Sequence, residues 1–160
     1  MTDDRSESTH YRVFDDALTL SEKVERIGRK RFGELTGRQA MFLAMVRLFE
    51  ERPSLGDVAR RARCSHQNAK TVLSALHKKG FLDFYLDKRD QRVLRIHLTE
   101  KGEVIGAQAL QELDKLLTLI EGRVEPEAAE VFSDVTIDLS KAFDEVFLTS
   151  EEPQEEADEA

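Results

Sequence analysis

The spacing of hydrophobic positions predicts a chain built mainly of amphipathic helices. In residues 11–31, apolar residues recur at steps of three or four, which places them on one face of a helix. Gly33 ends this helix, and Thr36 is placed to cap a second helix that stops near Pro53. The apolar face of the first helix consists of Val13, Ala17, Leu20, Val24 and Ile27, and the second helix is expected to turn Phe42, Leu43, Val46 and Phe49 inward.

Two shorter helices joined by a tight turn follow, which is typical of a helix-turn-helix. Ser54 caps the first, Arg63 and Cys64 form the turn, and Ser65 caps the second. Their buried sides are expected to be Leu55, Val58, Ala59 and Ala62, and then Ala69, Val72, Leu73 and Leu76. The second helix turns polar side chains outward, namely His66, Gln67, Asn68, Lys70, Thr71 and Ser74.

After Gly80 the pattern changes to two β-prone runs, residues 81–86 and 93–98, separated by a charged hexapeptide. This predicts a β-hairpin with a charged tip. Thr99 caps a fifth helix, and Pro126 begins a sixth. Their apolar faces are Ile105, Ala109, Leu113, Leu116 and Ile120, widened by Leu110 and Leu117, and then Phe132, Val135, Leu139, Phe143, Val146 and Phe147.

The predicted fold class is mainly α, a winged helix-turn-helix with a two-stranded β-wing and N- and C-terminal dimerisation helices. The first, fifth and sixth helices carry more apolar surface than a small central module can cover, and a second copy of the chain is the simplest partner. We expect an N-terminal dimerisation helix in 1–34, a DNA-binding winged helix-turn-helix in 35–100, C-terminal dimerisation helices in 101–148, and an acidic, disordered tail in 149–160.

Charge is distributed unevenly along the chain. The formal net charge is −8, but residues 52–101 hold 12 basic and five acidic side chains, a net +7, so the remainder carries −15. This basic segment coincides with the predicted helix-turn-helix and wing, and it favours a nucleic-acid partner. The acidic tail either competes with phosphate for the basic segment or only keeps the chain soluble.

Composition excludes several classes of protein. The single cysteine, Cys64, cannot form an internal disulfide, no basic leader precedes an apolar run, and no stretch has the roughly 20 apolar residues of a membrane span. We therefore expect a cytoplasmic protein that is not bound to a membrane. The four histidines have no metal-ligand spacing, and no phosphate-binding loop or nucleophile motif occurs. We expect no catalytic residues, no metal, no cofactor and no enzymatic activity.

Four short motifs between residues 35 and 102 resemble those of the MarR family of winged-helix regulators. They are Leu35-Thr36-x-x-Gln39, Leu76-x-x-x-Gly80-Phe81, Asp87-x-Arg89-Asp90-x-Arg92 and Leu98-Thr99-Glu100-Lys101-Gly102. The resemblance implies a homodimer with interlocked terminal helices that binds a pseudo-palindromic operator in double-stranded DNA. It also implies repression, relieved in many members by small ligands or thiol oxidation.

The predicted DNA contacts come from three places. An exposed helix of this kind reads bases in the major groove with its N-terminal half, and the wing reaches the minor groove and phosphates. The residues are Ser65, His66, Gln67, Asn68, Lys70 and Thr71 on the recognition helix, Lys88, Arg89 and Arg92 on the wing, and Ser54 as a phosphate contact. The family pattern implies that an aspartate of the wing holds Arg92. The alternative is a winged-helix module that binds protein.

Three further interpretations stay open. Cys64 is either a small packing residue or a redox switch whose oxidation adds bulk beside the recognition helix. An aromatic and methionine cluster is either core or, as the resemblance implies, a pocket for a small aromatic effector; it consists of Tyr11, Phe14, Met41, Phe42 and Met45. Arg60, Arg61 and Arg95 either contact DNA or form local ion pairs.

Overall fold

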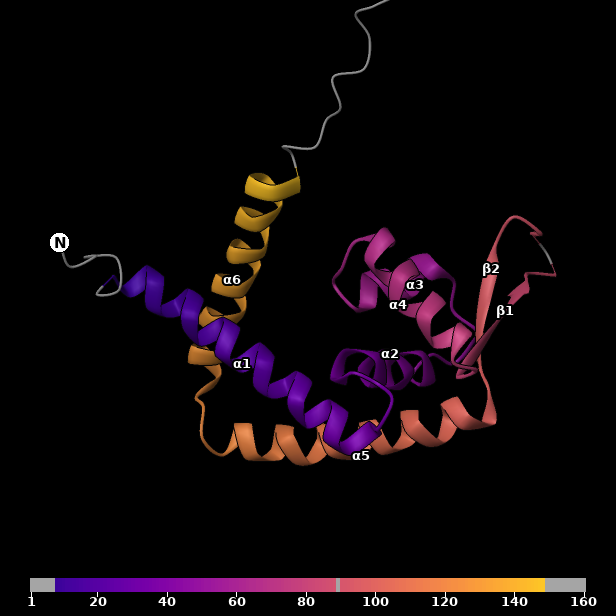
Figure 1. Cartoon of the computed structure of the whole chain (residues 1–160), viewed down its shortest axis with the longest axis horizontal. Coiled ribbons are helices and arrows are strands. Elements are labelled where there is room, and N and C mark those ends of the chain that lie inside the picture. Colours follow the sequence, from indigo (N-terminus) through magenta and orange to yellow (C-terminus); the bar gives the residue numbers. More distant parts are fainter. Residues whose placement is uncertain (1–7, 89, 149–160) are drawn as a thin grey trace, which may run out of the picture. The chain divides into compact units, whose positions relative to one another are not determined.

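The computed structural model describes residues 8–88 and 90–148, with side chains through residue 146. Within these residues the chain forms six α-helices, a short π-helical segment and one two-stranded antiparallel sheet (Figure 1). The elements are α1 Thr9–Phe32, α2 Gly37–Arg47, α3 Leu55–Arg61, α4 His66–Lys78, β1 Leu82–Leu86, β2 Leu94–Leu98, α5 Glu100–Glu121, α6 Pro126–Phe143 and η2 Asp144–Leu148. The predicted fold class is confirmed.

The elements belong to two compact units. Unit 2 spans Thr19–Thr118 and holds α2, α3, α4, the hairpin and the adjoining parts of α1 and α5. Unit 1 combines Met1–Leu18 with Leu119–Ala160, so its described part holds the start of α1, the end of α5, α6 and η2. Each unit is described by itself below.

The core of unit 2 lies between α2, α3, α4 and the hairpin. Every buried hydrophobic side chain among the described residues belongs to this unit. The largest of those that are fully enclosed are Phe42, Phe81, Leu35, Leu43, Leu73, Leu76, Leu82, Ile96 and Val58. Because the inner face of α4 supplies Leu73 and Leu76 to this core, the opposite face of the helix is held outward.

The predicted helix caps are confirmed in unit 2. The Thr36 hydroxyl accepts the Gln39 N–H at 3.1 Å, and the Gln39 side chain accepts the Thr36 N–H at 3.2 Å, which is a complete capping box. This reciprocal pair explains the Leu-Thr-x-x-Gln motif.

The predicted end of α2 near Pro53 is wrong. The helix ends at Arg47, because the N–H groups of Leu48 and Phe49 already donate to the carbonyls of Met45 and Val46 in tight turns.

The hairpin pairs Leu82 with Leu98, Phe84 with Ile96 and Leu86 with Leu94. These pairs share one face of the sheet, since side chains alternate along each strand. Burial falls along this face from the base of the hairpin to its tip, where Leu86 is 60% exposed. Both strands are one residue shorter than predicted and otherwise match.

The motif at the start of α5 is explained by a close approach between two backbones. The Thr99 hydroxyl donates to Gly80 O at 2.8 Å and accepts the Gly102 N–H at 3.2 Å. A Cβ at position 102 would lie 1.9 Å from Phe81 O, so only glycine fits without a shift. The Leu-Thr-Glu-Lys-Gly run therefore joins α5 to the end of the recognition helix.

Unit 1 contrasts with this packing. Phe14 stacks on Phe143 with ring centroids 5.7 Å apart. None of the side chains described in this unit is buried, and large apolar residues of α6 and η2 that were expected to face inward, including Phe132, Phe143 and Val146, are exposed. In unit 2 the α1 residues Leu20, Val24 and Ile27 are also about half exposed, so the apolar face predicted for this helix is only partly covered.

Candidate nucleic-acid interface

The recognition helix α4 presents a polar N-terminal half to solvent. Its cap, Ser65, accepts the Asn68 N–H at 3.1 Å. The Thr71 hydroxyl donates to Gln67 O at 3.0 Å, which leaves the methyl group and the oxygen lone pairs turned away from the helix backbone. All the residues predicted to read DNA from this helix are exposed: Ser65, His66, Gln67, Asn68, Lys70 and Thr71.

The turn before this helix is tight. Arg63 adopts a left-handed conformation with φ 48°, and the Cys64 N–H donates to Ala59 O at 3.1 Å. Cys64 is half-buried and packs against the core of unit 2. This contact fits the role of a small packing residue, whereas the redox role stays a prediction.

In the wing, Asp90 holds Arg92. Its Oδ1 accepts the backbone N–H of Arg92 at 3.0 Å and the side-chain Nε–H at 3.1 Å, and these bonds keep the pKa of Asp90 below its usual value. The Arg92 side chain is nevertheless 91% exposed, so its cation faces solvent. Lys88 is exposed as well, whereas Arg89 lies outside the described residues.

A hollow of about 500 Å³ lies between α4, the start of α3 and the wing. Its lining includes Ser54, His66, Lys70 and Arg92, which the sequence placed in three separate motifs. Apolar side chains of the hairpin, among them Leu94, complete the wall. The fold thus gathers predicted contacts from the recognition helix, the wing and the α3 cap around one concave surface of unit 2.

The donors of Ser54 are already engaged. Its N–H and its hydroxyl donate to Asp57 Oδ2 at 2.9 and 2.8 Å, and its hydroxyl accepts the Asp57 N–H at 3.2 Å. These bonds from Ser54, followed by the charges of Arg60 and Arg95, hold the pKa of Asp57 below its usual value. The phosphate contact predicted for Ser54 stays a prediction, and it must share or replace these bonds.

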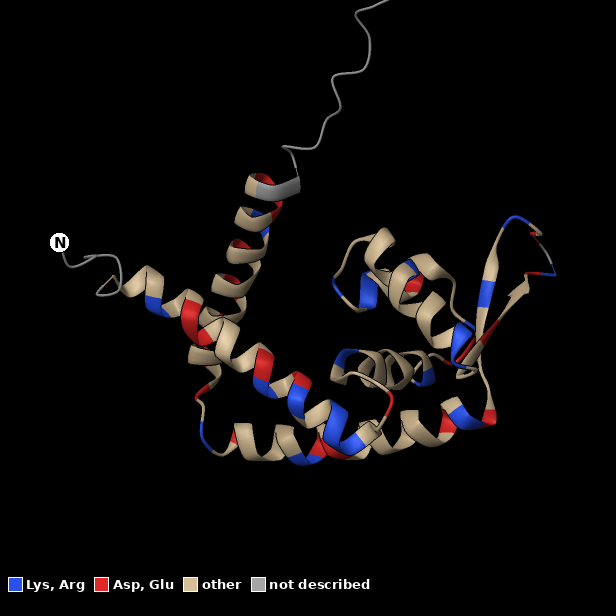
Figure 2. Cartoon of the chain, in the orientation of Figure 1, with Lys and Arg blue, Asp and Glu red and all other residues tan. Residues whose placement is uncertain are grey.

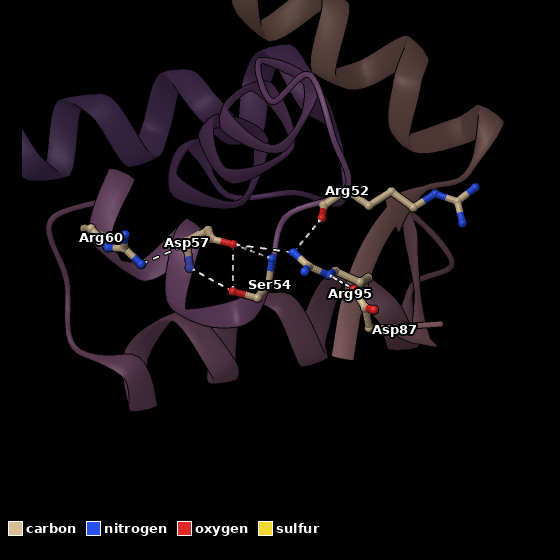
Figure 3. A network of polar contacts seen from close by, with 6 residues as sticks. All are labelled: Arg52, Ser54, Asp57, Arg60, Asp87 and Arg95. Carbon is tan, nitrogen blue, oxygen red and sulfur yellow. Dashed lines mark hydrogen bonds and ion pairs between the residues drawn. The ribbon is translucent and has the colours of Figure 1, made fainter. Parts of the chain in front are cut away.

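Arg95 forms one of the local ion pairs that the sequence left open as the alternative to a DNA contact (Figure 3). Its guanidinium donates to Asp87 Oδ2 at 2.6 Å and to Arg52 O at 3.2 Å, and it lies 3.8 Å from Asp57 Oδ2. The bond to Asp87 raises the pKa of Arg95. The only signal in the sequence was the acidic residue three positions after Ser54, which marks a capping box but says nothing of a partner on the hairpin.

The helix-turn-helix and the hairpin differ from α6 in the sign of their charge. Figure 2 shows Lys and Arg at the hairpin and around the turn between α3 and α4. Over Pro126–Phe143, by contrast, the chain has four acidic residues and one lysine. A basic, concave surface is the electrostatic form expected for a phosphate-bearing partner.

The residues predicted for an effector pocket fall in both units. In unit 2, Phe42 is buried in the core and Met41 and Met45 are half-buried. Tyr11 and Phe14 belong to unit 1. The pocket stays a prediction, and Phe42 has a packing role whether or not a ligand binds.

The described residues hold neither a metal-binding cluster nor a membrane-spanning helix. In 8–88 and 90–148 no three His, Cys, Asp or Glu side chains are grouped so that they can hold a metal ion. Across the same residues, no helix combines the length and the apolar character that crossing a membrane requires.

Solved structures match the chain well. Staphylococcus aureus MepR in complex with DNA matches with a TM-score of 0.66 and 19% identity, over 84% of this chain and 98% of MepR. MarR from Oenococcus oeni matches with a TM-score of 0.64 and 15% identity, over 81% and 96% of the two chains. Streptococcus pneumoniae FabT in complex with DNA gives 0.57 and 17%, over 84% and 97%. No protein-family model and no curated protein matches the sequence.

These proteins are regulators of the MarR family. The chain therefore has the winged-helix fold of MarR-family regulators. The resemblance drawn from the four sequence motifs is confirmed at the level of the fold.

Proposed function

We propose that the protein is a MarR-family transcriptional regulator that binds a specific inverted repeat in double-stranded DNA as a homodimer. The observation that carries this proposal is the basic hollow of unit 2, where Lys70 of the recognition helix and Arg92 of the wing line one surface. Two cations facing one hollow give it the positive potential that attracts a phosphate backbone.

The exposed half of α4 suits base readout. A helix fits the major groove, where each base pair shows a distinct pattern of donors and acceptors. Gln67 and Asn68 can pair with adenine, Lys70 can donate to guanine, and the methyl group of Thr71 can meet thymine. Each good bidentate pair discriminates against the wrong base by about 1–3 kcal/mol.

The wing supplies the second contact. Arg92 and Lys88 are exposed cations beside the hollow and at the tip of the hairpin, where phosphates would pass. Arg89 is proposed to enter the minor groove, where A·T-rich stretches concentrate negative potential. The comparisons support DNA as the partner, since the similar MepR and FabT structures are complexes with DNA.

A homodimer is supported by the exposed apolar faces of the terminal helices. A second copy would cover them, and two lobes related by a two-fold axis would match an inverted repeat. Repression then follows from the position of the dimer, which blocks RNA polymerase when the repeat lies in a promoter. We include a small aromatic effector, the redox role of Cys64 and the absence of enzymatic activity in the same proposal.

Selection from random-sequence duplex DNA tests the function. We expect the purified protein to enrich an inverted repeat, and we expect the double variant Gln67→Ala with Lys70→Ala to lose it. Arg89→Ala should keep the central bases but weaken affinity or the preference for A·T flanks. No enriched sequence, together with weak binding at low salt, would instead favour the protein-binding module, because phosphate contacts make true DNA binding strongly salt-dependent.

A further inference from the structure

Arg95 joins the hairpin to residues 52–57, a segment that is distant from it in the sequence. It lies on β2, opposite Tyr85 of β1. Its Nε–H donates to Asp87, its Nη1 donates to the carbonyl of Arg52, and the same Nη1 approaches Asp57 on α3. Figure 3 shows the guanidinium between the hairpin and the first turn of α3.

Two further contacts join the segment before α3 to the hairpin, one through the backbone and one through an aromatic ring. Ile96 N–H donates to Pro53 O at 2.9 Å, and Ser54 forms an isolated antiparallel bridge with Arg95. The Arg52 side chain lies over the Tyr85 ring, 5.5 Å from its centroid. The wing is thus braced against α3 by backbone, aromatic and ionic contacts, and Arg95 takes part in two of the three.

The guanidinium of Arg95 is engaged in these contacts, whereas that of Arg92 faces solvent. The Arg95 side chain is 34% exposed, and the structure points both its Nε–H and an Nη1–H at protein oxygens. Arg92 is 91% exposed, with Asp90 as the partner that the structure records. Two arginines three positions apart on the wing therefore have different environments.

We propose that Arg95 is a positioning residue, which fixes the wing relative to the helix-turn-helix and makes no contact with DNA itself. This inference rests on the proposed function for its consequence in DNA binding, but the brace can be tested without DNA. The planar fork of arginine suits the role because it can bond Asp87 and the Arg52 carbonyl at once, which a single ammonium group cannot do in the same geometry.

The first test uses amide hydrogen exchange by NMR on the free full-length protein. In Arg95→Gln, we expect the Ile96 amide to exchange at least about tenfold faster, because the join between β2 and the α3 segment opens locally. The Leu73 amide in the core of α4 should keep its protection. Unchanged protection at Ile96, or an equal loss at Leu73, would overturn the brace as a local device.

The second test separates positioning from phosphate contact by salt dependence. On duplex DNA selected by the wild-type protein, Arg95→Gln should lower affinity about tenfold if only about a tenth of the molecules then hold the wing in its binding position. The slope of log affinity against log salt should stay unchanged. Arg92→Gln should reduce that slope by about 1, as removal of a phosphate contact does. A similar reduction of slope in Arg95→Gln would overturn the proposal.

Two further variants complete the design. Arg60→Gln is the matched control, since Arg60 contacts the same Asp57 at 3.2 Å from an exposed position on α3 but does not reach the hairpin. It should leave the protection of the Ile96 amide unchanged. Arg95→Lys keeps the charge and should restore only part of the Ile96 protection. If the wild-type protein selects no DNA, the proposed function fails, while hydrogen exchange still decides on the brace.

Discussion

The two units of this chain use similar helices in opposite ways. Unit 2 buries its apolar residues against one another, and residues such as Leu73 and Leu76 have no exposed surface. Unit 1 also carries large apolar side chains along α6 and η2, but Phe132 is 55% and Val146 60% exposed. One unit is thus packed within the chain, and the other carries a hydrophobic surface typical of an interface.

The difference teaches that an apolar stripe predicts burial but does not say what buries it. Within unit 2 the stripes of α2 and α4 meet the hairpin and α3, so the chain closes its own core. Along α6 the same helical spacing occurs, but none of the described side chains of this helix is buried. The second copy of the chain that we propose would cover α6 and so resolve the contrast.

The largest effect is expected in unit 1. Phe132→Glu should raise the dimer dissociation constant at least about a hundredfold, because burying one Phe is worth about 1.5–3 kcal/mol and a two-fold interface counts the loss twice. Sedimentation velocity measures the change. Asp134→Ala, on the same helix, is the control and should leave the dimer intact. A dimer that survives Phe132→Glu would mean that this face of α6 is not the interface.

The next largest effect is expected in the core of unit 2. Leu73→Ala should lower the free energy of unfolding by about 2–5 kcal/mol, since it leaves a cavity beneath the recognition helix. Urea unfolding followed by circular dichroism gives this value. The truncation of an exposed leucine, Leu86→Ala at the tip of the hairpin, should cost much less. Equal losses would contradict the assignment of the core.

The sequence predicted local structure well and long-range contacts poorly. Caps such as Thr36 and Ser65 were found because a cap and its partner lie within three residues. The end of α2 was misplaced because tight turns at Leu48 and Phe49 compete with helix without a glycine or proline at that point. Arg95 stayed ambiguous because its contacts with Arg52 and Asp57 join residues about 40 positions apart.

The candidate site shows the same division. Exposure of Gln67, Asn68 and Lys70 followed from helical spacing, whereas the shared hollow that joins Lys70 with Arg92 depends on how the hairpin packs on α3. Hydrophobic spacing fixes which way a side chain faces, but not which distant side chain it will meet. The brace at Arg95 could therefore be found only in the folded chain.

A smaller effect is expected where α5 meets the recognition helix in unit 2. Gly102→Ala should destabilise the protein by about 1–3 kcal/mol, because the new Cβ would overlap Phe81 O and the two backbones must move apart. Thermal unfolding measures this loss. Gly56→Ala is the matched control, since its Cβ would meet nothing closer than Ser54 Oγ at 3.8 Å. Comparable losses at both sites would show that glycine at 102 matters for flexibility and not for the close approach.

The smallest effect concerns the cap of α3 and its dependence on pH. The bonds from Ser54 lower the pKa of Asp57 in the folded state, so the carboxylate adds stability at pH values above its ordinary pKa in the unfolded chain. That contribution disappears as pH falls from about 4 through the lowered pKa, where the folded carboxyl also takes up a proton.

We expect Asp57→Asn to cost no more than about 1 kcal/mol at pH 7, since the side chain is partly exposed, and to cost progressively less in acid. Urea unfolding at a series of pH values gives the comparison, and Ser54→Ala should reduce the same pH-dependent difference because it removes one of the bonds. A deficit of equal size at pH 7 and at pH 2.5 would show instead that Asp57 acts through its shape as a hydrogen-bonding cap, and that its charge adds nothing to the join between α3 and the wing.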